Sequence, residues 1–599
     1  MKKKIYIAVA AVLLVATVGA IAISVLLKNK EEICKTGYYI VNKPGELLGK
    51  KIGANDIWEY EEKEIEYEGS NNVIYSTATC DTTSTSTTKS NVSYGRNTSS
   101  ESYVGYSVGG ANNIKNFREN INNGYLPLST DITYNGLFSE YYFDPGKVDR
   151  DSNELFYPSY SVAVSTNPIT GEKEYYMSVG LNSNIKQEDF KRKKLNLVIV
   201  LDISGSMSSG FSSYYYDKKD NIGEKKTKMK IAEECVNGLI DKLNPDDRIG
   251  IVLFDNEAYR GCKITQIGDT DTEKLKEHIL EVNPMGGTNF SAGYEMGTEL
   301  FTDNLLQDDE YENRIIVITD AMPNLGITSQ DGMTEKIKKN SNNNIYTTFI
   351  GVGVDFNTKY TEGVSDVRGF NYYSVHSTEE FKKILVDEFD YMVTPLVFDL
   401  DLSFKSDYYE IENVYGSDSV NKQSGNIMHV NTLFPSSSND DGDVKGGIIV
   451  LKLKKIKEAD NAEISLNVSY KDTEEKAYNN SKKVTFKDSN EDYYDNNGIR
   501  KAVVLSRYVG TMKNWTIYEK TQYEEFEAKK ENNITEYCYD EDYVKTVLGV
   551  NERSSVKLNV SEGYKETFKE LKKYLEDENK ILNDEDMKKE IELLDKLSK

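Results

Sequence analysis

The amino-acid sequence predicts a doubly wound α/β domain in the middle of the chain, flanked by a β-rich, sandwich-like domain and a helical C-terminal region, with an N-terminal transmembrane helix. Three observations support this fold class. Short apolar runs alternate with helix-period segments between residues 195 and 390, strand-like segments follow Pro395 without helices, and amphipathic helices return after Gly498. A chain of 599 residues is too long for one hydrophobic core, so we expect several folding units.

The N-terminus predicts a membrane anchor. Residues 5–27 carry no charge, are bounded by lysines, and exceed the about 20 residues that a membrane-spanning helix needs. The alternative is a cleaved signal peptide, since residues 20–22 resemble a cleavage site. Lysines before the span favour a cytoplasmic N-terminus. We expect residues 1–30 to be an anchor or signal. The protein would then be a single-pass protein of the cell membrane, with the bulk of the chain extracellular.

Two segments separate this anchor from the α/β domain. Residues 76–102 consist largely of Ser, Thr and Asn, which cannot bury enough apolar surface to offset the entropy of ordering. We therefore expect residues 31–110 to form a flexible stalk. Residues 111–193 combine a short helix with strand-like runs at 157–165 and 174–181.

The α/β domain is expected at residues 194–395. Runs such as LNLVIVL are apolar on both faces, which suits parallel strands that helices cover on each side. The predicted strands are residues 195–201, 248–254, 314–319, 344–352 and 370–375. The predicted helices are residues 225–243, 271–282, 290–303, 331–340 and 377–390.

A β-rich domain is expected at residues 396–497 and a helical region at residues 498–599. The predicted strands of the β-rich domain are residues 396–405, 409–415, 446–454, 462–470 and 481–486. The strands within residues 157–181 are candidates to complete its sheet, with the α/β domain inserted between. The C-terminal region carries apolar residues at helical spacing among many charges.

Composition excludes several classes of function. With 73 Lys and Arg against 98 Asp and Glu, the net charge is −25, which argues against a nucleic-acid partner. The three His are far apart and the five Cys form no CxxC pair, so neither a zinc site nor a disulfide framework is indicated. No catalytic triad and no phosphate-binding loop is detectable, and we expect no enzyme.

Oxygen-bearing side chains follow the apolar strands. Asp202, Ser204 and Ser206 come directly after LNLVIVL, Thr288 lies in GGTN at the start of a helix, and Asp320 follows RIIVIT. Ligand sites in open α/β sheets gather beyond the carboxyl ends of strands, so these residues should meet. Carboxylates and hydroxyls are hard ligands that suit Mg²⁺, with Ca²⁺ or Mn²⁺ as alternatives.

These three segments resemble a known family. DISGSM, GGTNFSAG and ITDAMPN are similar to the parts of the metal-ion-dependent adhesion site of von Willebrand factor type A domains, which have a Rossmann-like fold. The resemblance implies that Ser204, Ser206 and Thr288 coordinate the ion. It also implies that Asp202 and Asp320 act directly or through water, and that one position stays open for a carboxylate of the ligand. Segments outside the α/β domain resemble bacterial exported or membrane-anchored proteins that contain such a domain.

The resemblance implies a binding function. We expect a cell-surface, divalent-cation-dependent binding or adhesion protein that recognises a protein or surface polymer through an acidic group. The alternative is a membrane-anchored assembly or maturation factor that acts with a partner complex such as an ATPase. The insertion at residues 208–228 holds Tyr214, Tyr215 and Tyr216, which either line the approach to the site or belong to a solvated loop.

Overall fold

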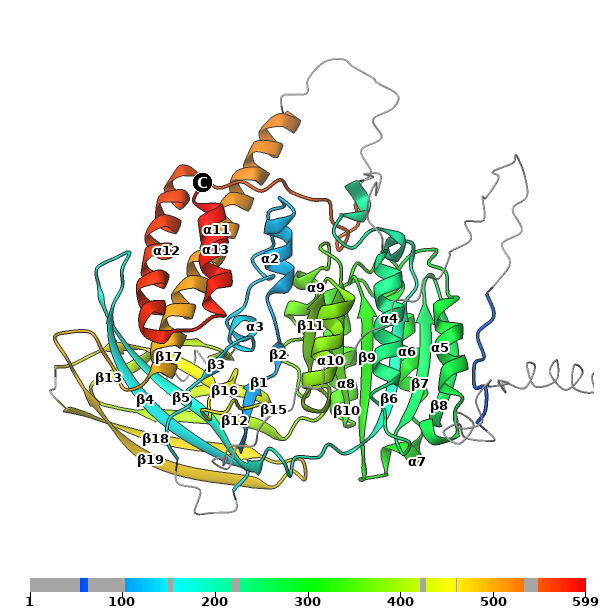
Figure 1. Ribbon diagram of the computed structural model, residues 1–599, viewed down its shortest axis with the longest axis horizontal. Coiled ribbons are helices and arrows are strands. Elements are labelled where there is room, and N and C mark those ends of the chain that lie inside the picture. The colour runs from blue at the N-terminus through cyan, green and yellow to red at the C-terminus, as the bar shows by residue number, and fades with distance from the viewer. Residues whose placement is uncertain are drawn as a thin grey trace, which may run out of the picture.

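The computed structural model of the chain describes residues 54–62, 103–148, 154–217, 226–417, 419–420, 427–458, 461–532 and 548–599. The predicted anchor at residues 1–30 lies outside these residues. Within them, no helix combines the length and apolar character that a membrane crossing requires. Figure 1 shows the α/β domain beside a large curved sheet, with a group of helices above that sheet.

The α/β domain is built on a seven-stranded sheet in the order β2-β11-β10-β9-β6-β7-β8. All pairs of neighbouring strands are parallel except β7 and β8. The strands are β2 (Gly110–Ala111), β6 (Lys194–Asp202), β7 (Arg248–Phe254), β8 (Ala258–Gln266), β9 (Tyr311–Thr319), β10 (Ile345–Val352) and β11 (Asn371–Val375). The predicted α/β fold is confirmed.

Helices cover both faces of this sheet because the side chains of β6 alternate. Leu197, Ile199 and Leu201 pack with α4, α5 and α10, whereas Val198 and Val200 pack with α6, α8 and α9. These helices are α4 (Lys228–Ile240), α5 (Thr272–Leu280), α6 (Phe290–Glu299), α8 (Gln330–Ser341), α9 (Thr358–Glu362) and α10 (Thr378–Met392). The short helix α7 (Asp303–Leu306) lies between α6 and β9.

Two strands of this sheet escaped the sequence prediction. The edge strand β8 is only partly buried and carries polar residues, so it shows no apolar run. The strand β2 has two residues and comes from the segment before the domain, where it pairs with β11. Strand prediction depends on a run of apolar residues, and neither the edge strand β8 nor the two-residue strand β2 has one.

All but two of the remaining described strands form one curved sheet. Eleven described strands belong to it: β1 (Tyr103–Val108), β4 (Phe156–Thr166), β5 (Lys173–Lys186), β12 (Val397–Lys405), β13 (Tyr409–Tyr415), β14 (Ser419–Val420), β15 (Ile427–Ser436), β17 (Ile448–Lys455), β18 (Asn461–Lys471), β19 (Ala477–Lys487) and β20 (Tyr493–Tyr494). Strand β5 pairs with β17, and β1 pairs with both β5 and β15. The α/β domain is thus inserted between strands of a single sheet. A separate pair joins β3 (Tyr142–Phe143) to β16 (Val444–Lys445).

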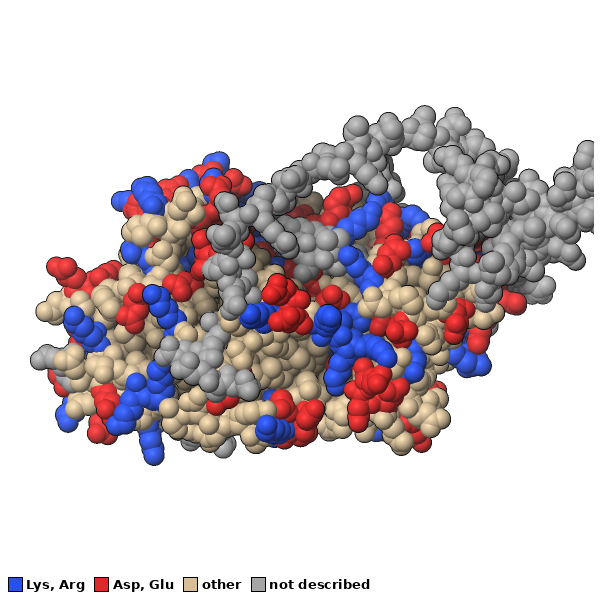
Figure 2. Space-filling view, turned by 60° about the horizontal axis from the view of Figure 1, so that its bottom comes forward, with Lys and Arg blue, Asp and Glu red and all other residues tan. Residues whose placement is uncertain are grey.

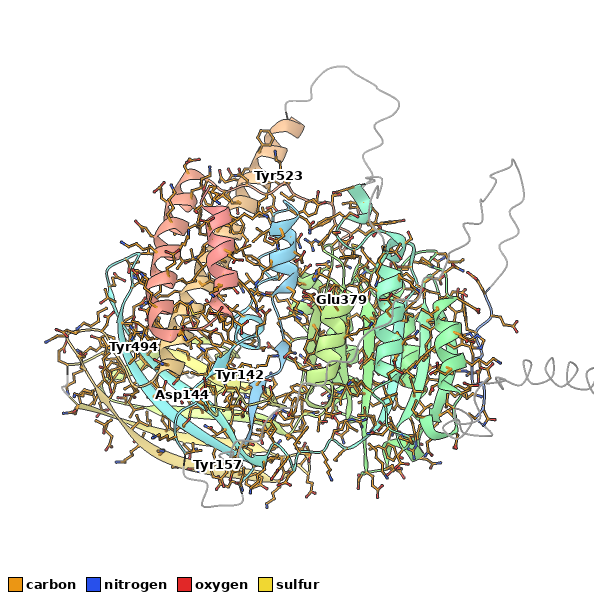
Figure 3. The ribbon with its side chains drawn as sticks, viewed as in Figure 1. Tyr142, Asp144, Tyr157, Glu379, Tyr494 and Tyr523 are labelled. Carbon is orange, nitrogen blue, oxygen red and sulfur yellow. The ribbon has the colours of Figure 1, made fainter. Side chains whose placement is uncertain are left out.

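Helices close one face of the curved sheet. Trp515 of α11 (Asn497–Asn532) is fully buried between Phe117 of α2 (Lys115–Asn122) and Phe568 of α12 (Glu562–Leu582). The helices α3 (Tyr134–Phe138) and α13 (Met587–Leu597) complete this layer. The far end of α11, marked by Tyr523 in Figure 3, projects beyond it.

Parts of the segment predicted as a flexible stalk are packed. Residues 54–62 lie along β8 and α5. The Glu59 N–H donates to the Gly261 carbonyl of β8 at 2.6 Å, and Trp58 stacks on His278 of α5 with ring centroids 5.6 Å apart. Strand β1 also begins within the predicted stalk. Aromatic and apolar residues explain the difference, because they offer burial that the Ser- and Thr-rich run lacks. Most of the predicted stalk lies outside the described residues.

Candidate metal centre

The five predicted ligands lie in three loops at the carboxyl edge of the seven-stranded sheet; we call them together the predicted metal site. Asp202 ends β6, and Ser204 and Ser206 follow within one turn. Thr288 precedes α6, and Asp320 directly follows β9. All five residues are buried. The parallel arrangement of β6 and β9 thus brings together residues that are far apart in sequence.

Hydrogen bonds fix the first loop. The Ser204 N–H donates to Asp202 Oδ1 at 2.9 Å, and the Thr319 hydroxyl donates to Asp202 Oδ2 at 2.6 Å. The hydroxyl oxygens of Ser204 and Ser206 lie 3.0 Å apart. Each oxygen of the Asp202 carboxylate therefore has a donor that holds its orientation, and both serine hydroxyls lie in the same small space.

The second loop is tied to the other two. The Gly205 N–H donates to the Gly286 carbonyl at 3.0 Å. Gly286 has φ +73°, and a Cβ there would lie 2.9 Å from Asn256 Nδ2, so this turn requires glycine. The Thr288 N–H donates to Asn324 Oδ1 at 2.8 Å, and the Asn324 N–H donates to the Thr288 carbonyl at 3.1 Å. Thr288 is thereby held next to the loop that follows Asp320.

A buried lysine accompanies the third loop. Lys228 Nζ lies 3.0 Å from Asp320 Oδ2 and 2.6 Å from Asp355 Oδ1, and all three side chains are fully buried. Ala321, the next residue after Asp320, adopts the left-handed φ of 56° that side chains rarely take. Its N–H donates to the Thr319 hydroxyl at 2.9 Å. Such local strain is typical of functional loops.

The electrostatics of the site favour a cation. Burial, together with the negative charge of Asp320, raises the pKa of Asp202 to about 7. Burial alone would lower the pKa of Lys228, but Asp320 and Asp355 outweigh it and the pKa is raised. One lysine thus stands among three buried carboxyl groups. A divalent ion beside Asp202 and Asp320 would stabilise the ionised form of both.

The donor set fits a hard divalent ion. Asp320 Oδ1 is buried and has no hydrogen-bond partner among the described residues, whereas Oδ2 is held by Lys228. A buried acceptor without a partner costs about 1–3 kcal/mol, which a bound ion would recover. No group of three or more His, Cys, Asp and Glu side chains in the described part of the chain could hold a metal. Binding here would therefore depend on the hydroxyls of Ser204, Ser206 and Thr288, as the sequence predicts.

Sequence reasoning missed Lys228. Alternating lysines at 226, 228 and 230 do not reveal which one is buried. The available signal is position, because Lys228 is the first residue of α4. A positive charge is unfavourable at a helix N-terminus, so a lysine there suggests a compensating acidic partner.

The tyrosines of the insertion separate into two groups. Tyr214 is buried, and its hydroxyl donates to Asn120 Oδ1 of α2 at 2.6 Å. Tyr215 lies beside the predicted metal site: its hydroxyl would be 3.4 Å from a Cβ placed on Gly205. Tyr216 donates a hydrogen bond to Glu552. The described part of the insertion is therefore packed rather than a solvated loop, and residues 218–225 lie outside the described residues.

Sequence comparisons agree with this fold. A family profile described as von Willebrand factor type A domain matches residues 197–322, which include all three loops. The chain is 24% identical over 227 residues to the uncharacterized protein YfbK of Escherichia coli (strain K12), covering 37% of this chain and 36% of that protein. It is 22% identical over 214 residues to inter-alpha-trypsin inhibitor heavy chain H2 of Homo sapiens, covering 35% of this chain and 21% of that protein. The matched region thus spans about a third of YfbK and about a fifth of the inter-alpha-trypsin inhibitor heavy chain.

Solved structures give matches of low overall similarity. The ArnB paralog VWA2 from Sulfolobus acidocaldarius matches with 14% identity and a TM-score of 0.35, covering 74% of this chain and 97% of that chain. The conserved hypothetical protein BatB from Bacteroides thetaiotaomicron matches with 20% identity and a TM-score of 0.26, covering 32% of this chain and 96% of that chain. The profile match supports a von Willebrand factor type A domain in the central part of the chain.

Proposed function

We propose that this protein, built around a von Willebrand factor type A domain, binds a protein or surface polymer through a divalent cation held at the predicted metal site. The ion would be Mg²⁺, with Ca²⁺ or Mn²⁺ as alternatives. The observation that carries the proposal is Asp320 Oδ1, a buried carboxylate oxygen without a hydrogen-bond partner among the described residues, next to a loop of serine hydroxyls. When bound, the ion supplies a positive centre that an acidic group of the ligand completes.

Different residues of the chain orient the predicted ligands and adjust the charge around the ion. Thr319 and the Ser204 N–H hold the Asp202 carboxylate in one orientation. Lys228 neutralises part of the charge of Asp320, so that few negative charges face the ion. An ion that its protein ligands do not fully neutralise retains attraction for an external carboxylate. This arrangement favours ligand capture over tight, closed coordination.

Binding is favoured over catalysis by the placement of the histidines. His278 contacts Asp56, His376 contacts Asn116, and His429 contacts Asp401. None of these partners belongs to the predicted metal site, so the site lacks an imidazole general base. With the predicted anchor at residues 1–30, ligand binding would take place outside the cell membrane.

The direct test is titration calorimetry of the full chain with Mg²⁺. Asp202→Ala, Ser204→Ala and Thr288→Ala should abolish Mg²⁺ binding while the circular dichroism spectrum stays unchanged. Ser208→Ala is the matched control, because Ser208 lies in the same loop but is exposed and donates to the Gly205 carbonyl. Unchanged Mg²⁺ affinity in all three variants would disprove the proposal.

A second measurement addresses the ligand. Capture of an extracellular polymer or surface protein by the immobilised chain in Mg²⁺, but not in EDTA, is expected for a binding protein. Recovery of one stoichiometric partner complex from the native membrane would instead favour the role of an assembly factor. On the face shown in Figure 2, basic and acidic side chains are interspersed, so that face offers no single-sign patch to a ligand.

A further inference from the structure

A segment of the C-terminal region lies over the loops of the α/β domain. Residues 549–555 follow α11 in the chain and precede α12, and Figure 1 shows this stretch beside the short 3-10 helix of the insertion, Tyr215–Asp217. Asn551 anchors it: its side-chain amide donates to the carbonyls of Pro323 at 3.0 Å and Thr328 at 2.8 Å, and Asn357 Nδ2 donates to the Asn551 carbonyl at 3.0 Å. Asn551 is buried by these contacts.

The next residue presents a carboxylate to the same loops. Glu552 Oε1 accepts hydrogen bonds from Asn324 Nδ2 at 2.8 Å and from the Tyr216 hydroxyl, and Oε2 accepts from the Gly549 N–H at 2.7 Å. Partial burial raises the pKa of Glu552, but the hydrogen bonds from Tyr216 and Asn324 outweigh it and the pKa is lowered. The loops thus form a receptor for an ionised carboxylate.

This receptor adjoins the predicted metal site. The Asn324 side chain donates to Glu552 through Nδ2 and accepts from the Thr288 N–H through Oδ1, so one amide group separates the two residues. Tyr215, whose hydroxyl lies close to Gly205, packs against Tyr216 with ring centroids 5.0 Å apart. The carboxylate of Glu552 is therefore held at the edge of the site, where an acidic ligand would approach.

The two ends of the segment differ in how firmly they are held. Arg553 donates to the Phe356 carbonyl at 2.8 Å and to the Tyr214 hydroxyl at 2.9 Å, and the Ser555 N–H donates to Asp217 Oδ1 at 2.9 Å. Val550, in contrast, is 96% exposed. An incoming partner can therefore reach the segment from the Val550 end without disturbing the core.

We propose that residues 549–555 are an internal acidic ligand that covers the approach to the predicted metal site and must be displaced by the partner. The inference rests on the proposed function. The Tyr216 hydroxyl and the Asn324 amide are neutral hydrogen-bond donors, so they can donate to a carboxylate of the partner as well as to that of Glu552. The partner is expected to present an Asp or Glu side chain on a protein loop, because the internal ligand is itself such a loop. While Glu552 stays in place, its charge repels that group.

The test uses the full chain and a fluorescent peptide with the sequence of residues 547–556. In Mg²⁺, fluorescence anisotropy should show at least about tenfold tighter peptide binding to the double variant Asn551→Ala/Glu552→Gln than to wild type, since charge-assisted hydrogen bonds are lost from the competing segment. Glu552→Gln alone should give an intermediate affinity. Gln in place of Glu in the peptide should abolish binding, because Tyr216 and Asn324 hold the carboxylate of Glu552. Glu562→Gln, an exposed residue of α12 paired with Lys565, is the control and should behave as wild type.

Three results separate the two proposals. Equal peptide affinity in wild type and double variant, with normal Mg²⁺ binding by calorimetry, overturns the internal ligand and leaves the proposed function intact. Peptide binding that the exchange of Glu for Gln in the peptide does not reduce also overturns it, because the segment would then dock without its carboxylate. Absence of Mg²⁺ binding in the wild type overturns both proposals.

Discussion

Two buried aspartates at opposite edges of the seven-stranded sheet have different surroundings. Asp247, at the amino edge, accepts from Arg192 Nη1 at 2.9 Å and Nη2 at 2.6 Å, and from the N–H groups of Leu195 at 2.9 Å and Asn244 at 2.6 Å. Asp320, at the carboxyl edge, has Lys228 on one oxygen and no hydrogen-bond partner among the described residues on the other. A satisfied carboxylate stabilises the fold, whereas an incomplete one is available for a ligand.

The largest effect on stability should come from removing the carboxylate of Asp247. Among the described residues, Asp247→Ala leaves the buried Arg192 side chain with the exposed Asp390 as its one acidic partner, and should lower the free energy of unfolding by about 3–5 kcal/mol. Chemical denaturation followed by circular dichroism measures this loss. Ser204→Ala should change stability by less than about 1 kcal/mol in EDTA. Equal losses in both variants would contradict the comparison.

Binding of Mg²⁺ beside Asp320 should stabilise the wild type. At a Mg²⁺ concentration about 100 times the dissociation constant, the free energy of unfolding should rise by about 2.7 kcal/mol, because the ion binds only the folded chain. Ser204→Ala should show no such rise, and Ser208→Ala should match the wild type. Thermal denaturation with and without EDTA gives the measurement. A similar rise in Ser204→Ala would place the ion elsewhere.

A smaller effect should come from Glu312, which shares the amino edge with Asp247. Glu312 is buried on β9, and its Oε1 lacks a hydrogen-bond partner among the described residues. Burial raises the pKa of Glu312 to about 7 although Arg314 opposes this, whereas the ordinary value is 4.5. Between about pH 4.5 and about pH 7, Glu312 is therefore ionised in the unfolded chain and protonated in the folded chain. Stability gained below about pH 4.5 is lost as the pH rises through about 7.

The wild type should accordingly be more stable at about pH 5.5 than at about pH 7.5, and Glu312→Gln should reduce this difference by about 2 kcal/mol. Calorimetric melting in EDTA at both pH values provides the comparison. If the variant keeps the full pH dependence of stability, the protonation of Glu312 is not its cause.

The sequence predicts those parts of the molecule whose signal is local. The apolar runs of β6, β7 and β9 identify a buried parallel sheet, and the position of Asp202 and Asp320 directly after such runs places them at one edge. Ser204 and Ser206 follow Asp202 so closely in the sequence that they are predicted to lie at the same edge. A pattern of a few residues, combined with the rule for strand ends, therefore predicts the position of the whole site.

The parts that sequence reasoning missed depend on distant contacts. Glu552 and Asn324 are separated by 228 positions, and Lys228 and Asp320 by 92. Neither contact has a periodic or spacing signal, since it exists only after the chain has folded and brought the two residues together. Strand β15 also went unpredicted. It mixes His, Asn and Thr with apolar residues, which weakens the apolar pattern of a central strand.

Insertion of the α/β domain within the curved sheet has a consequence for the order of folding. Gly105 of β1 pairs with Ser436 of β15, so these strands can join only after more than half of the chain has been synthesised. The strands of the inserted domain pair over shorter separations, and proteins rich in such contacts fold faster. Once folded, that domain holds the chain that follows β5 against the chain that precedes β12, since Arg192 donates to Asp390 at 2.8 Å and Phe190 packs on Tyr391, and this shortens the loop that the sheet must close. The inserted domain should therefore act as a folding template for the sheet that surrounds it in sequence.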